Sequence, residues 1–232
     1  MMTNMWNELV NLFYPNYCLL CGHPLVRHEQ FICLFCHCNL AKTCFHINKG
    51  NPARDLFAGF SQINEVTSYL FFEKEGTTQQ MIHALKYHGN KRLATYLGRI
   101  AATELKAEGM YASIDTILPI PLHPKKEKRR GYNQSEQIAK GFASVYGCNI
   151  ERKLLKRTTN TPSQTLKSVY DRHVNVENIF KLTTPESLYG KHVLLIDDVI
   201  TTGATVSSCL EALITVPEIQ ISIFSLAIAR EY

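Results

Sequence analysis

Residues 193–205, VLLIDDVITTGAT, join an apolar run to two adjacent carboxylates and then to a segment of threonine and glycine. The apolar run, residues 193–196, is typical of a strand that is buried on both faces of a parallel sheet. Ligands of open parallel sheets bind beyond the carboxyl ends of the strands, and Asp197 and Asp198 come at such an end. We therefore expect the two acids and the residues after them to form a ligand site.

The residues after the acids have the composition of an anion cradle. A helix is predicted to begin near Gly203 or Ala204, so that its free N–H groups and its positive dipole end face the same edge. Thr201, Thr202 and Thr205 add hydroxyl donors, and such a site suits a phosphomonoester. The carboxylates would repel a phosphate, but they can accept hydrogen bonds from sugar hydroxyls or hold a divalent ion. A ribose 5-phosphate unit satisfies both halves of the stretch.

The glycine spacing excludes two common phosphate-binding loops, because it fits neither GxGxxG nor GxxxxGK[ST]. The stretch instead resembles the phosphoribosyl-pyrophosphate motif of type I phosphoribosyltransferases: four apolar residues, Asp-Asp, two apolar residues and Thr-Thr-Gly-Ala-Thr. The resemblance implies that Asp197 and Asp198 contact the ribose 2′- and 3′-hydroxyls and that Mg²⁺ accompanies the ligand. Either acid could double as a general base, and we prefer Asp198. The residues that would hold the 5-phosphate are Thr201, Thr202, Gly203, Ala204 and Thr205.

Strands and helices are predicted to alternate along the chain around this motif. Strands are expected at residues 65–74, 114–122, 191–200 and 221–229. Helices are expected at residues 77–109, in two pieces broken near Gly89, at residues 133–147, with Asn133 as the N-cap, and after residue 203. This order predicts an α/β fold in which helices flank a mainly parallel sheet, as in type I phosphoribosyltransferases.

Two basic segments are expected to reach the same edge of the sheet, where a leaving pyrophosphate would need positive charge. The first, PIPLHPKKEKRRGYNQSE at residues 119–136, is expected to be a loop between a strand and a helix. The second, residues 155–180, is long and polar, and a long loop inside a compact domain is typical of a lid. Taken alone, each segment could equally be a solvated loop. The expected anion contacts are His123, Arg129, Arg130, Tyr132 and Asn133 in the first segment and Lys156, Arg157, Gln164, Lys167 and Arg172 in the lid.

The cysteines are concentrated in the first fifth of the chain, which indicates a metal site because a cytosolic protein rarely keeps disulfides. Two CxxC pairs, CLLC and CLFC, present four thiolates at the spacing of a tetrahedral Zn²⁺ site. The expected ligands are Cys18, Cys21, Cys33 and Cys36, with Cys38, Cys44, His37 and His46 as competitors. Four protein ligands leave no open position, so we expect the zinc to be structural.

The cysteine segment is too short to build a core of its own, so a small zinc-ribbon-like module is expected at residues 1–50. Turn-forming residues at 48–55, NKGNPARD, mark the end of this module. A phosphoribosyltransferase-like domain is expected at residues 56–232. Cys148 and Cys209 stand apart from the module and are expected to fill the core of this domain.

Taken together, these segments resemble one family more closely than the aspartate motif does alone. The double CxxC, PIPLHP…RRGYNQSEQIA, RTTNTPSQTLKSVYDRHVNVENIF and the aspartate motif resemble the ComF family, from about Tyr17 to the end of the chain. Members of this family, which includes the ComFC and GntX proteins, are linked to DNA uptake in natural transformation. The resemblance implies a competence protein that binds phosphoribosyl pyrophosphate or a related ribose phosphate. Single-stranded DNA, held by the basic segments, and other DNA-uptake proteins are candidate partners.

The alternative function is that of an active phosphoribosyltransferase with an unidentified nitrogen acceptor. A ligand-sensing repressor is disfavoured because no helix-turn-helix pattern precedes the sheet. The net charge of +5 favours anionic ligands of either kind. The sequence shows neither a run of eighteen apolar residues nor a signal peptide, so we expect a cytoplasmic protein without a transmembrane segment.

Overall fold

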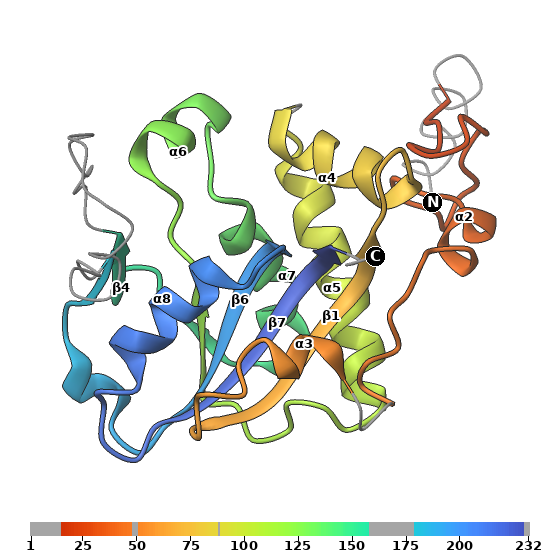
Figure 1. Ribbon diagram of the computed structural model, residues 1–232. Helices are drawn as coiled ribbons and strands as arrows, with labels where there is room; N and C mark the ends of the chain where they lie inside the picture. The colour runs from red at the N-terminus through yellow and green to blue at the C-terminus, as the bar shows by residue number, and fades with distance from the viewer. Residues whose placement is uncertain (1–14, 48–50, 88, 158–178, 230–232) are drawn as a thin grey trace, which may run out of the picture.

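A five-stranded sheet forms the centre of the computed structural model, which describes residues 15–47, 51–87, 89–157 and 179–229 (Figure 1). The strands lie in the order β1-β7-β6-β2-β3, and every neighbouring pair is parallel. The predicted α/β fold with a mainly parallel sheet is therefore confirmed. The strands are β1 (Ile63–Phe72), β2 (Thr116–Pro119), β3 (Asn149–Ile150), β6 (His192–Ile200) and β7 (Gln220–Ala229).

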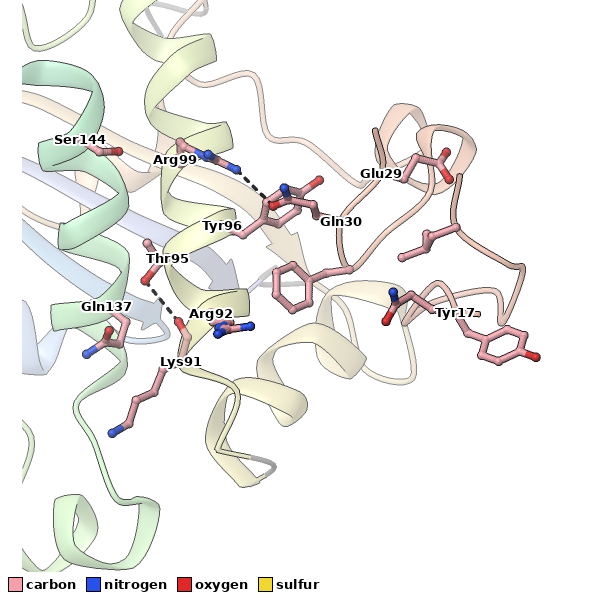
Figure 2. A pocket seen from close by; sticks show the side chains of 13 residues that line it. Tyr17, Glu29, Gln30, Lys91, Arg92, Thr95, Tyr96, Arg99, Gln137 and Ser144 are labelled. Atoms are coloured by element: carbon pink, nitrogen blue, oxygen red, sulfur yellow. Dashed lines mark hydrogen bonds between the residues drawn. The ribbon is translucent and has the colours of Figure 1, made fainter. Parts of the chain in front are cut away.

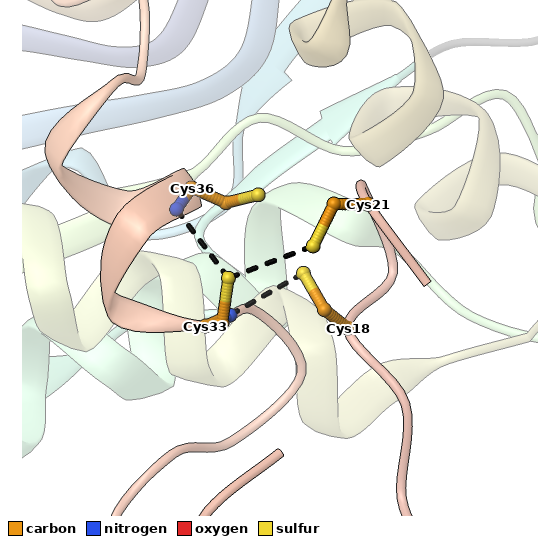
Figure 3. Close-up of side chains that lie close together, drawn as sticks. All are labelled: Cys18, Cys21, Cys33 and Cys36. Carbon is orange, nitrogen blue, oxygen red and sulfur yellow. Dashed lines mark hydrogen bonds between the residues drawn. The ribbon is translucent and has the colours of Figure 1, made fainter. Parts of the chain in front are cut away.

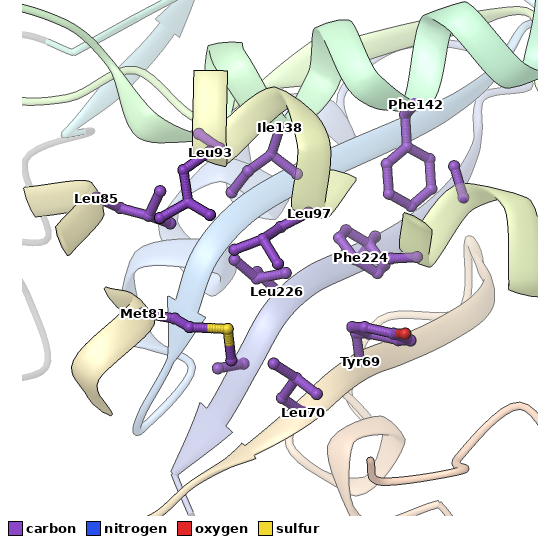
Figure 4. Close-up of a cluster of buried hydrophobic side chains, with 14 of the residues drawn as sticks. Tyr69, Leu70, Met81, Leu85, Leu93, Leu97, Ile138, Phe142, Phe224 and Leu226 are labelled. Carbon is purple, nitrogen blue, oxygen red and sulfur yellow. The ribbon is translucent and has the colours of Figure 1, made fainter. Parts of the chain in front are cut away.

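Helices cover both faces of the sheet because the strands are apolar on both sides. Leu194 and Ile196 of β6 belong to the core on one face, whereas Val193 and Leu195 belong to the core on the other, as the period of a strand requires. Figure 4 shows the first core, in which the ring of Phe142 lies 4.3 Å from that of Phe224 on β7. The first face is covered by α4 (Thr77–Tyr87), α5 (Lys91–Ala107) and α7 (Gln134–Tyr146), and the second by α3 (Pro52–Asp55) and α8 (Ala204–Leu213).

The chain leaves two adjacent strands toward opposite faces of the sheet. After β2 it returns to β3 through α7 on the first face, and after β6 it returns to β7 through α8 on the second. Such a switch point between neighbouring strands is where ligands bind in open parallel sheets. We call this region, at the ends of β2 and β6, the carboxyl edge.

The two basic segments differ from the expectations drawn from the sequence. The first basic segment, expected to be a loop, contains the helix α6 (Pro124–Arg130), which lies beyond the ends of β6 and β7 (Figure 1). Its lysines, arginines and glutamate are good helix formers, and Gly131, with a φ of 75°, ends it. The lid segment begins and ends in an antiparallel pair, β4 (Leu155–Arg157) with β5 (Phe180–Leu182), and a 3₁₀ turn, η2 (Pro185–Leu188), follows. No described helix is long and apolar enough to cross a membrane.

The cysteine segment, which includes α2 (Leu34–Cys38), packs on the first core. Cys18 and Ile32 are buried in the same cluster as the leucines of α5. Lys42 Nζ lies 2.8 Å from a carboxylate oxygen of Glu104 on α5, and Tyr69 Oη donates a hydrogen bond of 2.9 Å to the same carboxylate. Described residues of the two predicted parts, 1–50 and 56–232, therefore contribute to one hydrophobic core, and the boundary between the parts stays a prediction.

Helices α5 and α7 pack at close range because each has a glycine where they meet. A Cβ atom at Gly98 would overlap the backbone of Ile138, and one at Gly141 would overlap the backbone of Thr95. The close contact fixes the position of α7, whose first turn brings Ser135 to the carboxyl edge.

Gly141→Ala should destabilise the protein, because a methyl group would force the two helices apart. Overpacking of this kind costs about 1–3 kcal/mol, and each kcal/mol lowers the thermal midpoint by roughly 2–4 °C in a domain of this size. Circular dichroism melting measures the change. Gly59→Ala is the matched control, because a Cβ atom there meets nothing within 4 Å. An unchanged midpoint for Gly141→Ala would contradict the close packing.

Candidate functional site

Asp197 and Asp198 follow the buried run of β6 and lie at the carboxyl edge, partly exposed. Asp197 Oδ1 accepts hydrogen bonds from the backbone N–H of Asp198 at 2.8 Å and from the hydroxyl of Ser135 at 3.3 Å. Asp198 Oδ1 accepts a bond of 2.8 Å from the backbone N–H of Val199, and its Oδ2 lies 3.5 Å from Nζ of Lys86. Each acid keeps oxygen lone pairs for a ligand, since a carboxylate has about four acceptor sites.

The pKa of Asp197 is raised to about 7, first by burial and then by the neighbouring charge of Asp198. A carboxyl group in this state is easily ionised by a ligand that brings positive charge or hydrogen-bond donors. Ligand binding at this edge should therefore release a proton near neutral pH.

The loop after β6 has the free amide groups that an anion site requires. Helix α8 begins at Ala204 after Gly203, whose φ of 76° favours glycine and whose Cβ would lie 3.1 Å from the ring of Phe57. The backbone N–H groups of Thr202, Gly203 and Thr205 donate to no described residue. A hollow of about 30 Å³ is lined by Asp197 and residues 199–206. Asp197 and the predicted phosphate loop thus face one space.

The first basic segment supplies fewer free donors than expected. Tyr132 is buried, and its hydroxyl donates to the carbonyl oxygen of Leu85. Asn133 caps α7 through its Oδ1, as predicted, and its Nδ2 donates a bond of 2.9 Å to the carbonyl oxygen of Ile120. Nδ1 of His123 accepts a bond of 3.2 Å from the backbone N–H of Lys125 at the start of α6. The described hydrogen bonds of these three side chains are all made to other residues of the protein, so these side chains hold the segment in shape.

Arg130 keeps donor capacity at the carboxyl edge. One guanidinium nitrogen, Nη1, donates a bond of 2.9 Å to Gln134 Oε1, while its Nε is buried without a hydrogen-bond partner among the described residues. A buried N–H group without a partner is costly and often marks a site for an anion or a water molecule. Arg129, in contrast, is exposed on α6.

Lys86, at the end of α4, is a site residue that the sequence did not indicate. Its Nζ reaches Asp198 although 112 residues separate them, and 23% of its side chain is exposed. Only the packing of α4 on the sheet places it there, so no local pattern could have singled it out.

The lid prediction is covered only in part by the structure. Lys156 and Arg157 lie on β4, where the guanidinium of Arg157 is 5.5 Å from the ring of Phe180. Gln164, Lys167 and Arg172 lie outside the described residues. The lid at residues 155–180 stays a prediction.

The four predicted cysteines form one cluster (Figure 3). Their sulfur atoms all lie within 4.8 Å of one another, and Sγ of Cys21 is 3.6 Å from Sγ of Cys33. Burial opposes ionisation of Cys18, but amide hydrogen bonds, that of Cys21 first, outweigh it and lower the pKa of this thiol to about 6. A thiolate is the form that binds a metal, so the cluster could hold one ion. The four residues are Cys18, Cys21, Cys33 and Cys36.

No family model matches the chain, but its sequence is similar to curated bacterial proteins over most of its length. DNA utilization protein YhgH of Escherichia coli O157:H7 is 27% identical over 219 residues, which cover 88% of this chain and 92% of that protein. Competence protein F of Haemophilus influenzae is 33% identical over 110 residues, 46% of this chain and 48% of that protein. The resemblance to competence-related proteins is thereby confirmed.

Phosphoribosyltransferases are among the solved structures with some likeness to the chain. Adenine phosphoribosyltransferase from Saccharomyces cerevisiae is 13% identical with a TM-score of 0.37, over 60% of this chain and 69% of that one. These values carry no argument about the site, and the α/β assignment rests on the sheet order described above.

Asp197→Asn should stabilise the unliganded protein at pH 8 and leave its stability nearly unchanged at pH 4. The folded carboxyl, with a pKa of about 7, holds a proton that the unfolded chain releases near pH 3.8, so this group makes stability fall as the pH rises between those values. Asparagine stays neutral and removes that loss. Thermal midpoints from pH 4 to pH 8 measure the effect, with Asp55→Asn, an exposed acid on α3, as the control. A gain that is equal at all pH values would contradict the raised pKa.

Proposed function

We propose that the carboxyl edge binds phosphoribosyl pyrophosphate or a closely related ribose phosphate. The observation that carries this proposal is that Asp197 and a loop with free amide groups line one hollow at a switch point of the sheet, with Asp198 as the next residue of the same strand end. Asp197 and Asp198 would accept hydrogen bonds from the sugar hydroxyls. The amides of Thr202, Gly203 and Thr205, at the positive end of α8, would hold the 5-phosphate.

The pyrophosphate end would lie toward Lys86 and Arg130. The ammonium of Lys86 lies beside Asp198, and Arg130, bonded to Gln134 in the first turn of α7, has an unpartnered Nε among the described residues. Mg²⁺ fits this edge, because one or two carboxylates together with phosphate oxygens are its usual ligands. Bound there, it would neutralise charge on the pyrophosphate.

We further propose that the protein takes part in DNA uptake. The relatives are named for DNA utilization and competence, which supports this role but assigns no residues. Helix α6 carries exposed basic side chains beyond the carboxyl edge, where they would attract a nucleic-acid backbone. The cations on α6 are Lys125, Lys126, Lys128, Arg129 and Arg130.

Transfer of the sugar phosphate to a nitrogen acceptor is the second candidate. The raised pKa of Asp197, about 7, favours it, because such a carboxylate can accept a proton at neutral pH. Asp198 is paired with Lys86, so Asp197 becomes the better candidate for the general base. Release of pyrophosphate on addition of a nitrogen acceptor would distinguish transfer from binding alone.

We propose that the cysteine cluster holds a structural Zn²⁺ ion. A tetrahedral site with Zn–S bonds of about 2.3 Å places its sulfur atoms about 3.8 Å apart, and the 3.6 Å between Cys21 and Cys33 fits that geometry. Cys38 and Cys44, the competing cysteines, are exposed and outside the cluster. The ion would join the loop that carries Cys18 to the start of α2.

Isothermal titration calorimetry with phosphoribosyl pyrophosphate and Mg²⁺ tests the sugar-phosphate site. The double variant Asp197→Asn with Asp198→Asn should lose all measurable binding while keeping a cooperative thermal transition, because it lacks the acceptors for the hydroxyls and the metal. Glu186→Gln, on the 3₁₀ turn η2, is the control and should bind as the wild type does. Binding retained by the double variant would count against the assignment.

Zinc content by mass spectrometry tests the metal site. Cys33→Ser should lose the ion and lower the thermal midpoint, since one of four thiolates is gone and Cys33 is itself buried. Cys38→Ser and Cys148→Ser are matched controls that should keep about one ion per chain. Undiminished zinc in Cys33→Ser would reject this ligand set.

A further inference from the structure

A second cavity, separate from the carboxyl edge, lies between the cysteine segment and α5 (Figure 2). Its volume is about 780 Å³, which is within the usual range of ligand sites. One wall consists of α5 and α7, and the other includes Tyr17, Leu25 and Phe31 of the cysteine segment. We call this cavity the module groove. It exists only because the cysteine segment packs beside α5.

The α5 wall is basic and aromatic. Arg92, Tyr96 and Arg99 are spaced at i, i+4 and i+7, so they share the face of α5 opposite its buried leucines. The guanidinium of Arg99 lies 5.8 Å from the ring of Tyr96. Arg92 is exposed and makes no ion pair or hydrogen bond through its side chain to another described residue. A charged side chain of this kind is available to a ligand.

The opposite wall presents the ring of Phe31 to the same space. Phe31 has a φ of 61°, a costly conformation for a bulky residue, and its ring lies 5.4 Å from that of Tyr96. The hydrogen bond of 2.8 Å from the backbone N–H of Leu19 to the carbonyl oxygen of Phe31 holds this bend. Tyr17 is 59% exposed, and its ring points away from α5 (Figure 2). The rings of Phe31 and Tyr96 line the groove, and aromatic rings are surfaces on which bases stack.

Positive charge dominates the groove. Glu29 is the only acid among the described residues that line it. Its carboxylate accepts bonds of 2.9 Å and 2.6 Å from the backbone N–H groups of Val26 and Leu34. The cations of α5 therefore face no other acid of the described chain across the groove that could neutralise them.

We propose that the module groove binds single-stranded nucleic acid, with phosphates on Arg92 and Arg99 and bases against Phe31 and Tyr96. Interleaved cations and aromatic rings are the combination that such ligands require, whereas an apolar peptide would leave Arg92 without a partner, since Arg99 donates a bond of 3.4 Å to Gln30 Oε1. The inference rests on the proposed role in DNA uptake and deepens it, because it names a binding surface other than α6. In this proposal the cysteine segment forms the second wall of the binding site.

Fluorescence anisotropy of a labelled 15-nucleotide oligothymidylate, measured at 50 and 200 mM salt, tests the proposal. Arg92→Ala with Arg99→Ala should weaken binding about tenfold and reduce the salt slope by about 1.4, because each phosphate that is no longer neutralised accounts for roughly 0.7. Tyr96→Leu should weaken binding about tenfold with an unchanged slope, because stacking does not release counterions. Lys106→Ala with Lys191→Ala removes the same charge at the amino end of the sheet and should bind within twofold of the wild type.

The outcomes distinguish a failure of the groove inference from a failure of the proposed role in DNA uptake. Thermal midpoints, zinc content and binding of phosphoribosyl pyrophosphate should match the wild type in every groove variant. If Arg92→Ala with Arg99→Ala binds normally while Arg129→Ala with Arg130→Ala does not, the groove inference fails and the role in DNA uptake stands. If the wild type does not bind the oligonucleotide, both fail. If the wild type instead forms a concentration-dependent dimer in sedimentation and the groove variant does not, the groove holds a second copy of the chain, and the inference is wrong.

Discussion

Burial of β6 on both faces is the constraint on which the site depends. The strand lies between β2 and β7, and residues 193–196 are fully buried. No charged side chain can enter that stretch without loss of stability, so the acids come where the sheet ends. The same position brings them beside the first turn of α8 and beside α7, which the Gly98–Gly141 contact holds close to α5. Hydrophobic packing therefore creates a polar edge with a defined geometry.

The carboxyl edge holds two adjacent acids whose charges must be accommodated. Two adjacent carboxylates would repel each other, and the structure reduces this cost in two ways: a lysine pairs with Asp198, and the pKa of Asp197 is raised by burial and by its neighbour. A ligand that brings hydroxyl donors and a divalent ion would reduce the repulsion between the two acids. The unliganded protein therefore carries an electrostatic cost at the position where such a ligand would remove it.

The cysteine segment contributes to the fold as well as to a local metal site. The ion pair between Lys42 and Glu104, and the contact of Phe31 with Tyr96, attach it to α5. A segment with so small a core needs an internal cross-link to keep this surface in place. Metal binding and the shape of the module groove would then depend on each other.

Local features of the chain were predictable, and features formed by tertiary contacts were not. The apolar run before Asp197, the break near Gly89 and the cap at Asn133 each follow from a few neighbouring residues, and the structure has all three. Helix α6 was missed because a run of basic residues between prolines and glycine has the composition of a loop. Lys86 reaches the site only through the packing of α4, and the internal bonds of Tyr132 depend on the same contact.

A crystal structure of the protein grown with phosphoribosyl pyrophosphate and Mg²⁺ tests the central claim most directly. The account predicts the ribose hydroxyls against Asp197 and Asp198 and the 5-phosphate on the amides of residues 202–205. A ligand bound elsewhere, or one whose 5-phosphate lies against α6 while the loop amides face water, would contradict it.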